Sequence, residues 1–468
     1  MIKPGYEQYR TISKEQFQYV PLFCEKLGDR ATPISLSEKF RNRTPFVLLE
    51  SADRGEIWGR YSFLIFDVDE VWEIWEFGDL ISFLEKTFPQ VRVFPGLPVP
   101  FVGGAVGFLS YDAVKTWEHT VPKREIKFPL GYFVKARRFI YFDHLKHLIG
   151  IVYLARTEDR EDFERGKEWI KKQEEEINRE EKIDAENDFF QIRRPIESNF
   201  SQQQFMKSVT KVIRLIEEGH ASQVVISQRF STEFAGDPFR PYRFLRSLNP
   251  SPYLFYLDGG SFQIAGSSPE MLVKLQGSTI FTKPIAGTRK RREDLAEEEI
   301  IQDLMSDEKE RAEHTMLLDL GRNDLGRVCT PGTVKVEEMM AVERYSHVFH
   351  IVSTVSGQLS LGTTSWRALQ ACFPAGTVSG APKVRAMEII EEIEPQSRGP
   401  YAGSLGYLSF DGNMDMCIVI RSLFFQQGKV SVQAGAGIVY DSIPENEYQE
   451  TKSKAEALLL ALKMSQGE

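Results

Sequence analysis

The stretch from Phe373 to Glu450 constrains the fold more than any other part of the chain. It sets glycine-rich turns beside apolar strands, places Arg421 inside the hydrophobic run CIVIRSLFF, and ends in a helix that opens with carboxylates. A guanidinium is costly to bury without a partner, and in an apolar strand its planar fork most often binds a carboxylate. That carboxylate belongs either to a structural Asp or Glu or to a ligand.

Two glycines interrupt the strand that follows this arginine. The run VSVQAGAGIVY carries Gly435 and Gly437 at alternate positions. They either mark a bulge or allow backbone N–H groups to approach an anion closely.

Carboxylates recur in pairs on two predicted helices. The segment SDEKERAEHTMLLDLGRNDLG is predicted to be a helix with Ser306 as its N-cap, and Glu310 and Glu313 share one of its faces. The C-terminal helix places Glu447 and Glu450 on a face that becomes apolar one turn later. Carboxylates shielded from solvent need a cation, and oxygen ligands of this kind suit Mg²⁺. The alternative is a pair of solvated acidic faces.

Two further polar residues lie in strand-like patterns. His350 alternates with Val348 and Val352, where a lone histidine is more often a satisfied core residue than a catalyst. In QVVISQRF, alternate side chains point to opposite faces, so Gln223 is a candidate for a side chain that faces a cavity. A helix capped by Ser201 is predicted just before this strand.

Length and element order favour an α+β fold. A chain of 468 residues exceeds one ordinary core, so two domains or one large two-lobed fold is expected. Strands and helices alternate irregularly without a βαβ period, which indicates antiparallel sheets wrapped by helices. The predicted division is a sheet-rich lobe over residues 1–160, a charged helix and linker over 161–195, and a C-terminal domain over 196–468.

Composition limits the partners. The chain carries 58 Lys and Arg against 67 Asp and Glu, a net charge of −9, and shows no basic stripe, so nucleic acid is not expected as a partner. The N-terminus MIKPGYEQYR lacks the apolar core of a signal peptide, and no apolar run approaches the roughly 18 residues of a membrane span. A soluble, cytoplasmic protein without a membrane partner is therefore predicted.

Taken together, these segments resemble the chorismate-utilising enzymes, and most closely the family of anthranilate synthase large subunits. The resemblance spans nearly the whole chain, and its motifs are QVVISQRF, GSSPE, PIAGTR, EHTMLLDLGRNDLGRV, GTVSGAPKVRAM, IVIRS, QAGAG and ETKSKA. It implies one intertwined α+β fold, in which two large, mostly antiparallel sheets pack face to face, surrounded by helices. The active site would lie in the cleft.

The resemblance also implies a role for individual residues. Glu313 and Glu450 would hold Mg²⁺, Glu310 would protonate the departing ring hydroxyl, and His350 would assist the later loss of pyruvate. The residues implied to bind or line chorismate are Gly287, Thr288, Tyr401, Arg421, Gly435, Ala436, Gly437 and Lys454.

Two positions bear on the nucleophile. Relatives that add water to chorismate carry a lysine base where this chain has Gln223, and aminodeoxychorismate synthases commonly carry an attacking lysine where it has Ala286. The resemblance therefore implies ammonia as the nucleophile and anthranilate as the product. Aminodeoxychorismate synthase of folate biosynthesis is the alternative.

The first lobe resembles a feedback site for tryptophan. The segments LLES and NPSPYLFY imply an inhibitor pocket formed by Leu48, Glu50, Ser51, Pro252, Tyr253 and Leu254. The alternative is a strand and a turn that only support the lobe interface. A tryptophan-binding regulatory protein without catalysis is a rival from another class, and the intact set of acidic residues, His350 and Arg421 argues against it.

No glutaminase motif is present in the sequence. There is no cysteine elbow with a downstream catalytic histidine pair, so a separate glutamine amidotransferase subunit is expected to supply ammonia, in a heterotetramer. One departure from the family is the GHASQVV segment, in which His220 and Ala221 replace the acidic turn that is common before this strand.

Overall fold

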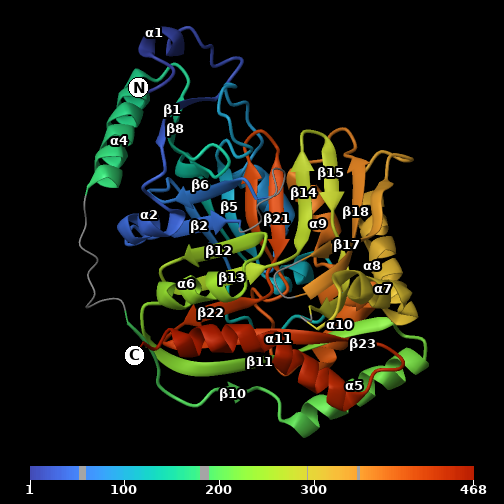
Figure 1. Cartoon of the computed structure of the whole chain (residues 1–468). Helices are drawn as coiled ribbons and strands as arrows, with labels where there is room; N and C mark the ends of the chain where they lie inside the picture. Colours follow the sequence, from blue (N-terminus) through green and yellow to red (C-terminus); the bar gives the residue numbers. More distant parts are fainter. Residues whose placement is uncertain (52–58, 180–188, 292–293, 345–347, 468) are drawn as a thin grey trace.

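The computed structural model places two large antiparallel sheets inside a shell of helices (Figure 1). It describes residues 1–51, 59–179, 189–291, 294–344 and 348–467. Every ladder between the named strands in these ranges is antiparallel. The predicted α+β class with mostly antiparallel sheets is confirmed.

One sheet joins strands from both halves of the chain. Its strands are β1 Tyr19–Leu27, β2 Phe46–Glu50, β3 Tyr61–Ile65, β7 Arg138–Asp143, β8 Leu148–Arg156, β9 Phe190–Ile192, β10 Glu197–Ser198, β11 Gln223–Gly236, β12 Tyr253–Asp258, β13 Phe262–Ser268, β19 Gly380–Ala381, β22 Ser422–Gln426 and β23 Lys429–Ile438. Their order is β1-β8-β7-β3-β2-β12-β13-β22-β23-β11-β10, with β19 and β9 also paired to β11.

The second sheet has the order β16-β18-β15-β14-β21-β20-β5-β6-β4, and β17 pairs with β18. The bounds of its strands are β4 Val71–Ile74, β5 Gly104–Leu109, β6 Gly131–Ala136, β14 Met271–Gln276, β15 Thr279–Thr282, β16 Ile285–Lys290, β17 Lys335–Arg344, β18 Val348–Gln358, β20 Ser404–Ser409 and β21 Met414–Ile418.

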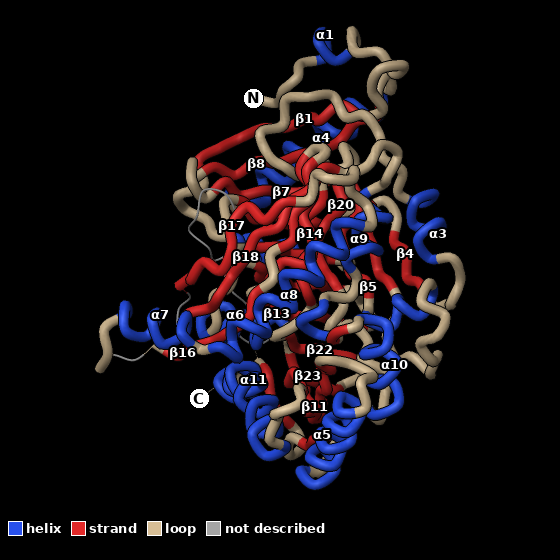
Figure 2. Tube along the Cα trace, turned by 90° about the vertical axis from the view of Figure 1, so that its right-hand side faces the viewer, coloured by secondary structure: helices blue, strands red, loops and turns tan. Residues whose placement is uncertain are grey.

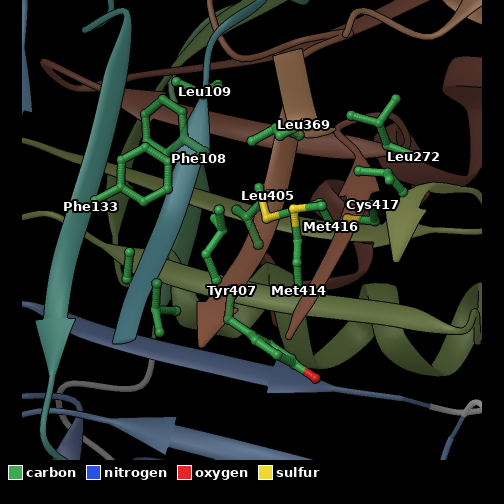
Figure 3. Packing of buried hydrophobic residues seen from close by; sticks show 14 of the residues in the cluster. Phe108, Leu109, Phe133, Leu272, Leu369, Leu405, Tyr407, Met414, Met416 and Cys417 are labelled. Atoms are coloured by element: carbon green, nitrogen blue, oxygen red, sulfur yellow. The ribbon is translucent and has the colours of Figure 1, made fainter. Parts of the chain in front are cut away.

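The main core lies between the two sheets. Phe63 on β3 meets Tyr407 on β20 with ring centroids 6.0 Å apart, and Phe108 on β5 meets Phe262 on β13 at 5.7 Å. Figure 3 shows part of this core, where Phe108 and Tyr407 lie among aromatic, leucine and methionine side chains of the second sheet. Buried aromatic rings thus join the sheets face to face, as the resemblance implied.

Helices cover the outer faces. Their bounds are α1 Tyr6–Tyr9, α2 Pro33–Phe40, α3 Leu80–Thr87, α4 Arg160–Asn178, α5 Gln202–Glu217, α6 Phe239–Leu248, α7 Glu297–Ser306, α8 Glu308–Gly326, α9 Ser365–Cys372, α10 Lys383–Ile393 and α11 Pro444–Met464, with 3₁₀ turns η1 Tyr111–Thr116 and η2 Gly376–Val378. Helices α2, α4, α6 and α11 share a second core with the first sheet, and α5 and α10 share a third core with β11 and β23. Figure 2 shows α8 and α9 against the second sheet. No helix in the described ranges is long and apolar enough to cross a membrane.

Segments before residue 160 and after residue 196 contribute to both sheets. The ladder β2·β12 joins them in the first sheet, and β5·β20 joins them in the second. Helix α4 lies between them in the sequence, as the charged segment predicted. The sheets therefore run continuously through both parts. The division at 160 and 196 is a division by function, and it stays a prediction.

Local signals fixed the helix starts in two of three cases. Ser201 caps α5 in a reciprocal capping box with Gln204, as predicted, and α11 begins at Pro444, as predicted. The prediction that Ser306 caps α8 is wrong. Ser306 ends α7, and the side chain of Asp307 accepts hydrogen bonds from the first N–H groups of α8. A carboxylate at this position both caps the helix and complements its dipole.

Candidate active site

Strands β11 and β23 and helices α8 and α11 bring the predicted polar residues together. In the ladder between β11 and β23, Val225 lies opposite Gly437 and Ser227 opposite Gly435. Helix α11 runs along β23, and α8 packs against β16 and β18 (Figure 1). The turn between β21 and β22 adds Arg421.

The turn before β11 delivers Gln223 to this site despite its unusual sequence. Gly219 adopts a φ of 82°, which closes helix α5, and Ala221 is buried. The N–H of Ser222 donates to the carbonyl of Ala381 at 2.7 Å. His220 stays on the surface beside Glu218, so the departure from the acidic turn leaves the strand start intact.

Glu313 on α8 is a half-buried glutamate whose side chain is hydrogen-bonded by a neutral amide. Nε2 of Gln223 donates to Oε1 of Glu313 at 3.1 Å. Burial raises the pKa of Glu313, and the nearby carboxylates of Glu310 and Glu450 raise it further. The structure thus places the two predicted metal ligands, Glu313 and Glu450, close enough to interact electrostatically across two helices.

Glu450 is linked to the backbone of β23 through a lysine. Nζ of Lys454 lies 2.6 Å from Oε1 of Glu450 and donates to the carbonyl of Gly435 at 3.0 Å. One turn of α11 separates the two side chains, which places them on the same face. Lys454 therefore lies beside the expected ligand carboxylate, where the resemblance implied it.

These carboxylates fit a divalent cation. Burial raises the pKa of Glu447 as well as that of Glu313, and nearby Glu450 contributes to both shifts; Lys454 offsets the negative charge at both sites and Lys309 offsets it at Glu447. Among the described residues, no group of three or more His, Cys, Asp and Glu side chains is clustered as a complete metal cage. Two carboxylates with open positions suit Mg²⁺, which keeps waters or substrate oxygens in its shell.

Arg421 is half-buried in the turn between β21 and β22. Its Nη1 donates to the carbonyl of Lys454 at 3.0 Å. Burial lowers the pKa of the guanidinium, and Tyr401 and Glu450 only partly oppose that shift. In the part of the chain that the structure describes, no carboxylate forms an ion pair with Arg421. Of the two alternatives raised by the sequence, this favours an anionic ligand.

The glycines of β23 leave room beside this arginine. A Cβ on Gly437 would meet Nε2 of Gln223 at 2.7 Å, and one on Gly435 would meet the Tyr401 hydroxyl at 3.0 Å. Burial raises the pKa of Tyr401 to about 12, so the hydroxyl stays a donor. The side chain of Ala436 points the other way, into the third core. Any contact of Ala436 with a ligand is therefore through its backbone.

Strand β16 forms the opposite wall. The register shifts between Ala286 and Thr288, and Gly287 has a φ of 71°. Nδ1 of His350 donates to the Gly287 carbonyl at 3.0 Å, and burial lowers the pKa of this imidazole. A Cβ on Gly287 would lie 3.2 Å from Oε2 of Glu310. For Thr288 only the backbone is described, so its predicted side-chain contact lies outside the described atoms.

Glu310 is engaged by an arginine. Nη1 of Arg289 lies 3.0 Å from Oε1 of Glu310, and the same guanidinium pairs with Asp303 at 2.7 Å and with Asp307 at 2.5 Å. This contact occupies one oxygen of Glu310 with a guanidinium. The role of proton donor that the resemblance implied for Glu310 stays a prediction, and this ion pair argues against it.

Glu270 is a candidate that sequence reasoning passed over. It follows β13 in the motif GSSPE, lies against Thr377 and the backbone amide of Ile285, and is 6% exposed. Burial raises the pKa of this carboxyl from 4.5 to about 8. With Thr377 it lines a small cavity of ≈ 30 Å³ beside α8. The available signal was a glutamate directly before the apolar run MLVKL.

The residues of the expected tryptophan pocket also meet in space. In the ladder between β2 and β12, Glu50 lies opposite Leu254, and Leu48 and Leu254 are buried. The Tyr242 hydroxyl donates to Glu50 at 2.6 Å, and Arg246 binds its other oxygen at 3.1 Å. The remaining members follow directly in sequence, Ser51 after β2, Pro252 before β12 and Tyr253 as its first residue.

Comparison with known proteins agrees with this geometry. Residues 45–460 match the chorismate binding enzyme family. Anthranilate synthase component 1 of Aquifex aeolicus (strain VF5) is 44% identical over 98% of this chain and 98% of that protein. The protein of the same name from Acetivibrio thermocellus is 41% identical over 99% of each.

Solved structures share the fold. Anthranilate synthase component I from Streptococcus pneumoniae TIGR4 superposes with a TM-score of 0.78 at 36% identity, covering 92% of this chain and 98% of that one. The menaquinone-specific isochorismate synthase MenF from Escherichia coli is 20% identical and superposes with a TM-score of 0.73, covering 97% of each chain. The chain thus belongs to the chorismate-binding enzyme family, and the relatives at 41% and 44% identity that match nearly its whole length are anthranilate synthase component 1 proteins.

Proposed function

We propose that this chain converts chorismate and ammonia to anthranilate and pyruvate, the first step of tryptophan biosynthesis. The observation that carries the proposal is the half-buried guanidinium of Arg421, which lies within electrostatic reach of the Glu450 carboxylate and forms an ion pair with no acidic side chain among the described residues. A positive charge without an acidic partner, near the exposed Glu450 carboxylate, suits a substrate that brings its own carboxylates together with a cation.

The two sides of the site would bind different parts of chorismate, which carries two carboxylates. Arg421, the Tyr401 hydroxyl and the backbone amides of Gly435 and Gly437 would hold the enolpyruvyl side chain and its carboxylate. Glu313 and Glu450 would hold Mg²⁺ near the ring carboxylate. When bound, Mg²⁺ neutralises that carboxylate and draws electron density from the ring.

Glu270 is the better candidate for the proton donor. Hydroxide is a poor leaving group at neutral pH, so the ring hydroxyl needs an acid. A carboxyl with a pKa of about 8 is protonated at pH 7, whereas Glu310 is held by Arg289. Glu270 would transfer its proton to the hydroxyl oxygen as that C–O bond breaks, releasing water.

Ammonia is the nucleophile that forms the new C–N bond. Its lone pair forms the C–N bond at the ring carbon beside the one bearing the carboxylate, as the ring double bond shifts. Neither the amide of Gln223 nor the methyl of Ala286 can act as a base or a nucleophile, and ammonia needs neither. These two residues therefore favour ammonia over water or an enzyme amine.

Loss of pyruvate completes the reaction. The proton on the amino-bearing ring carbon leaves, the ring becomes aromatic, and the enolpyruvyl C–O bond breaks; the released enol takes up a proton to become pyruvate. Burial keeps His350 neutral, and a neutral imidazole is able to accept the ring proton.

Incubation of the chain with chorismate, MgCl₂ and an ammonium salt tests the proposal. Fluorescent anthranilate and an equal amount of pyruvate are expected. An aminodeoxychorismate that persists without release of pyruvate would instead assign the chain to folate biosynthesis, and no turnover together with tryptophan binding would indicate a regulatory protein.

Regulation and assembly are part of the proposal. The pocket of β2 and β12 within residues 1–160 and 249–254 would bind tryptophan as a feedback inhibitor. A glutamine amidotransferase subunit, in a heterotetramer, would supply the ammonia, and the reaction would take place in the cytoplasm. Tryptophan titration of the assay and its repetition with glutamine and the partner subunit test these points.

A further inference from the structure

Arg421 holds an unfavourable backbone conformation. Its φ is 53°, in the left-handed region that residues with a side chain rarely adopt. Such a conformation persists only when neighbouring contacts hold it. Two are visible: the N–H of Ser267 donates to the Arg421 carbonyl at 3.1 Å, and Nη1 of Arg421 donates to the Lys454 carbonyl at 3.0 Å.

The side chain of Ser267 is bound by the loop at Asn249, which leads into the expected tryptophan pocket (the effector pocket). Its hydroxyl donates to the carbonyl of Asn249, and Nδ2 of Asn249 lies 3.3 Å from the same hydroxyl oxygen. Ser267 is 0% exposed, so these bonds do not exchange with water. Asn249 follows helix α6 and starts the run that continues into Pro252 and Tyr253.

The strand that carries Ser267 has little freedom to move independently. A Cβ on Gly266 would meet Oγ of Ser422 at 2.6 Å, so β13 approaches β22 closely, and β12 pairs with its other edge. Close-packed interiors transmit a displacement instead of absorbing it. Glu270 follows Ser267 by three residues, so a shift of this segment reaches both Arg421 and the proposed proton donor.

We propose that Ser267 is a positioning residue that couples occupancy of the effector pocket to the conformation of Arg421. The occupant is a free amino acid, for which tryptophan is the probe, and the inference rests on the feedback site proposed above. The Ser267 side chain is hydrogen-bonded to the Asn249 loop, and the Ser267 N–H donates to the Arg421 carbonyl. Loss of the hydroxyl would disconnect the two sites while leaving each one able to bind.

Thermodynamic linkage measures this coupling directly. Calorimetry gives the tryptophan Kd of the full chain with Mg²⁺, with and without saturating chorismate and with no ammonia source, so that chorismate is not consumed. The ratio of the two constants is the coupling factor, which is reciprocal between the sites. In the wild type we expect chorismate to weaken tryptophan binding about tenfold or more.

Ser267→Ala is expected to bring this ratio to within about twofold of unity, while the tryptophan Kd without chorismate changes by less than about threefold. Ser251→Ala is the matched control. The Ser251 hydroxyl also bonds Asn249, at 3.4 and 3.5 Å, but its residue makes no contact with Arg421, so the ratio should keep its wild-type value. If Ser267→Ala does not fold, Ser267→Cys, with its weaker thiol donor, should lower the ratio by a smaller factor.

Three outcomes overturn the inference. A wild-type ratio in Ser267→Ala shows that the coupling takes another route, and loss of tryptophan binding in this variant shows a merely structural role. A wild type that makes anthranilate but binds no tryptophan overturns the feedback site and this inference with it. A ratio that collapses in Ser267→Ala, in a protein that makes no anthranilate, supports the coupling and contradicts the proposed reaction.

Discussion

Two arginines of this protein, the buried Arg398 and the half-buried Arg421, lie in opposite electrostatic surroundings. Arg398 donates to both oxygens of Glu394, at 3.1 and 2.7 Å, and to the carbonyls of Val378 and Val225. Although burial opposes it, the Glu394 carboxylate raises the pKa of Arg398, whereas burial without such a partner lowers that of Arg421. A satisfied buried charge supports the fold, while an unsatisfied one indicates a missing ligand.

The surroundings of Arg398 extend this contrast. Oε1 of Glu394 also accepts from the N–H and the hydroxyl of Ser227, both at 2.8 Å, and the Arg398 guanidinium lies 4.6 Å from the ring centroid of Tyr111. The network is completed by protein atoms alone. At the Arg421 site the guanidinium reaches Glu450 only indirectly, because Arg421 donates to the backbone carbonyl of Lys454 and the Lys454 ammonium contacts the Glu450 carboxylate.

Replacement of Arg421 should give the largest effect on catalysis. Arg421→Ala removes the charge that faces the substrate carboxylate, and kcat/KM for chorismate should fall by about 10²–10³-fold. Because no acid depends on this guanidinium, the urea midpoint should stay close to the wild-type value. A large loss of stability with little loss of activity would reverse the assignment of the two arginines.

Replacement of Arg398 should act on stability. Arg398→Ala leaves the Glu394 carboxylate buried without a cation, and the free energy of unfolding should fall by about 3–5 kcal/mol. Equilibrium urea denaturation measures this loss. Arg398→Ala combined with Glu394→Ala removes both charges and should recover part of the lost free energy of unfolding. A double variant as unstable as the single one would show that the loss does not come from the broken ion pair.

The pKa of Glu270 should set an alkaline limit on activity. Only the protonated carboxyl donates to the leaving hydroxyl, so kcat/KM should fall about tenfold per pH unit above the pKa of about 8. Glu270→Gln should remove this limb together with most of the activity. A flat profile to pH 9 in the wild type would exclude Glu270 as the acid.

The same group affects stability with a defined sign. The pKa of the folded state, about 8, lies above the ordinary value of 4.5, so the folded state binds more protons than the unfolded state between these values. The free energy of unfolding should therefore decrease as pH rises from about 4.5 to 8, and Glu270→Gln should reduce this slope. Urea midpoints at several pH values give the comparison, and an unchanged slope in the variant would contradict the raised pKa.

Local sequence signals predicted the elements of the site better than its chemistry. The run around Arg421 and the paired glutamates of α8 and α11 indicated where charge would be buried, because residue spacing on one helix or strand is a local property. Glu270 escaped notice because its raised pKa comes from burial in the folded chain, which the local sequence does not show; Thr377 and the Ile285 amide oppose that rise only in part. The ion pair between Glu310 and Arg289 is equally non-local, as it needs the register of β16 against α8.

The effect of Mg²⁺ on the affinity for chorismate tests the central claim most directly. Chorismate is titrated calorimetrically into wild type and into Glu450→Gln, with and without Mg²⁺ and without an ammonia source. Mg²⁺ should tighten chorismate binding to the wild type by about tenfold or more, and the variant should show little of this gain. Equal chorismate affinity with and without Mg²⁺ in the wild type, or an undiminished gain in Glu450→Gln, would contradict a cation held by the carboxylates opposite Arg421.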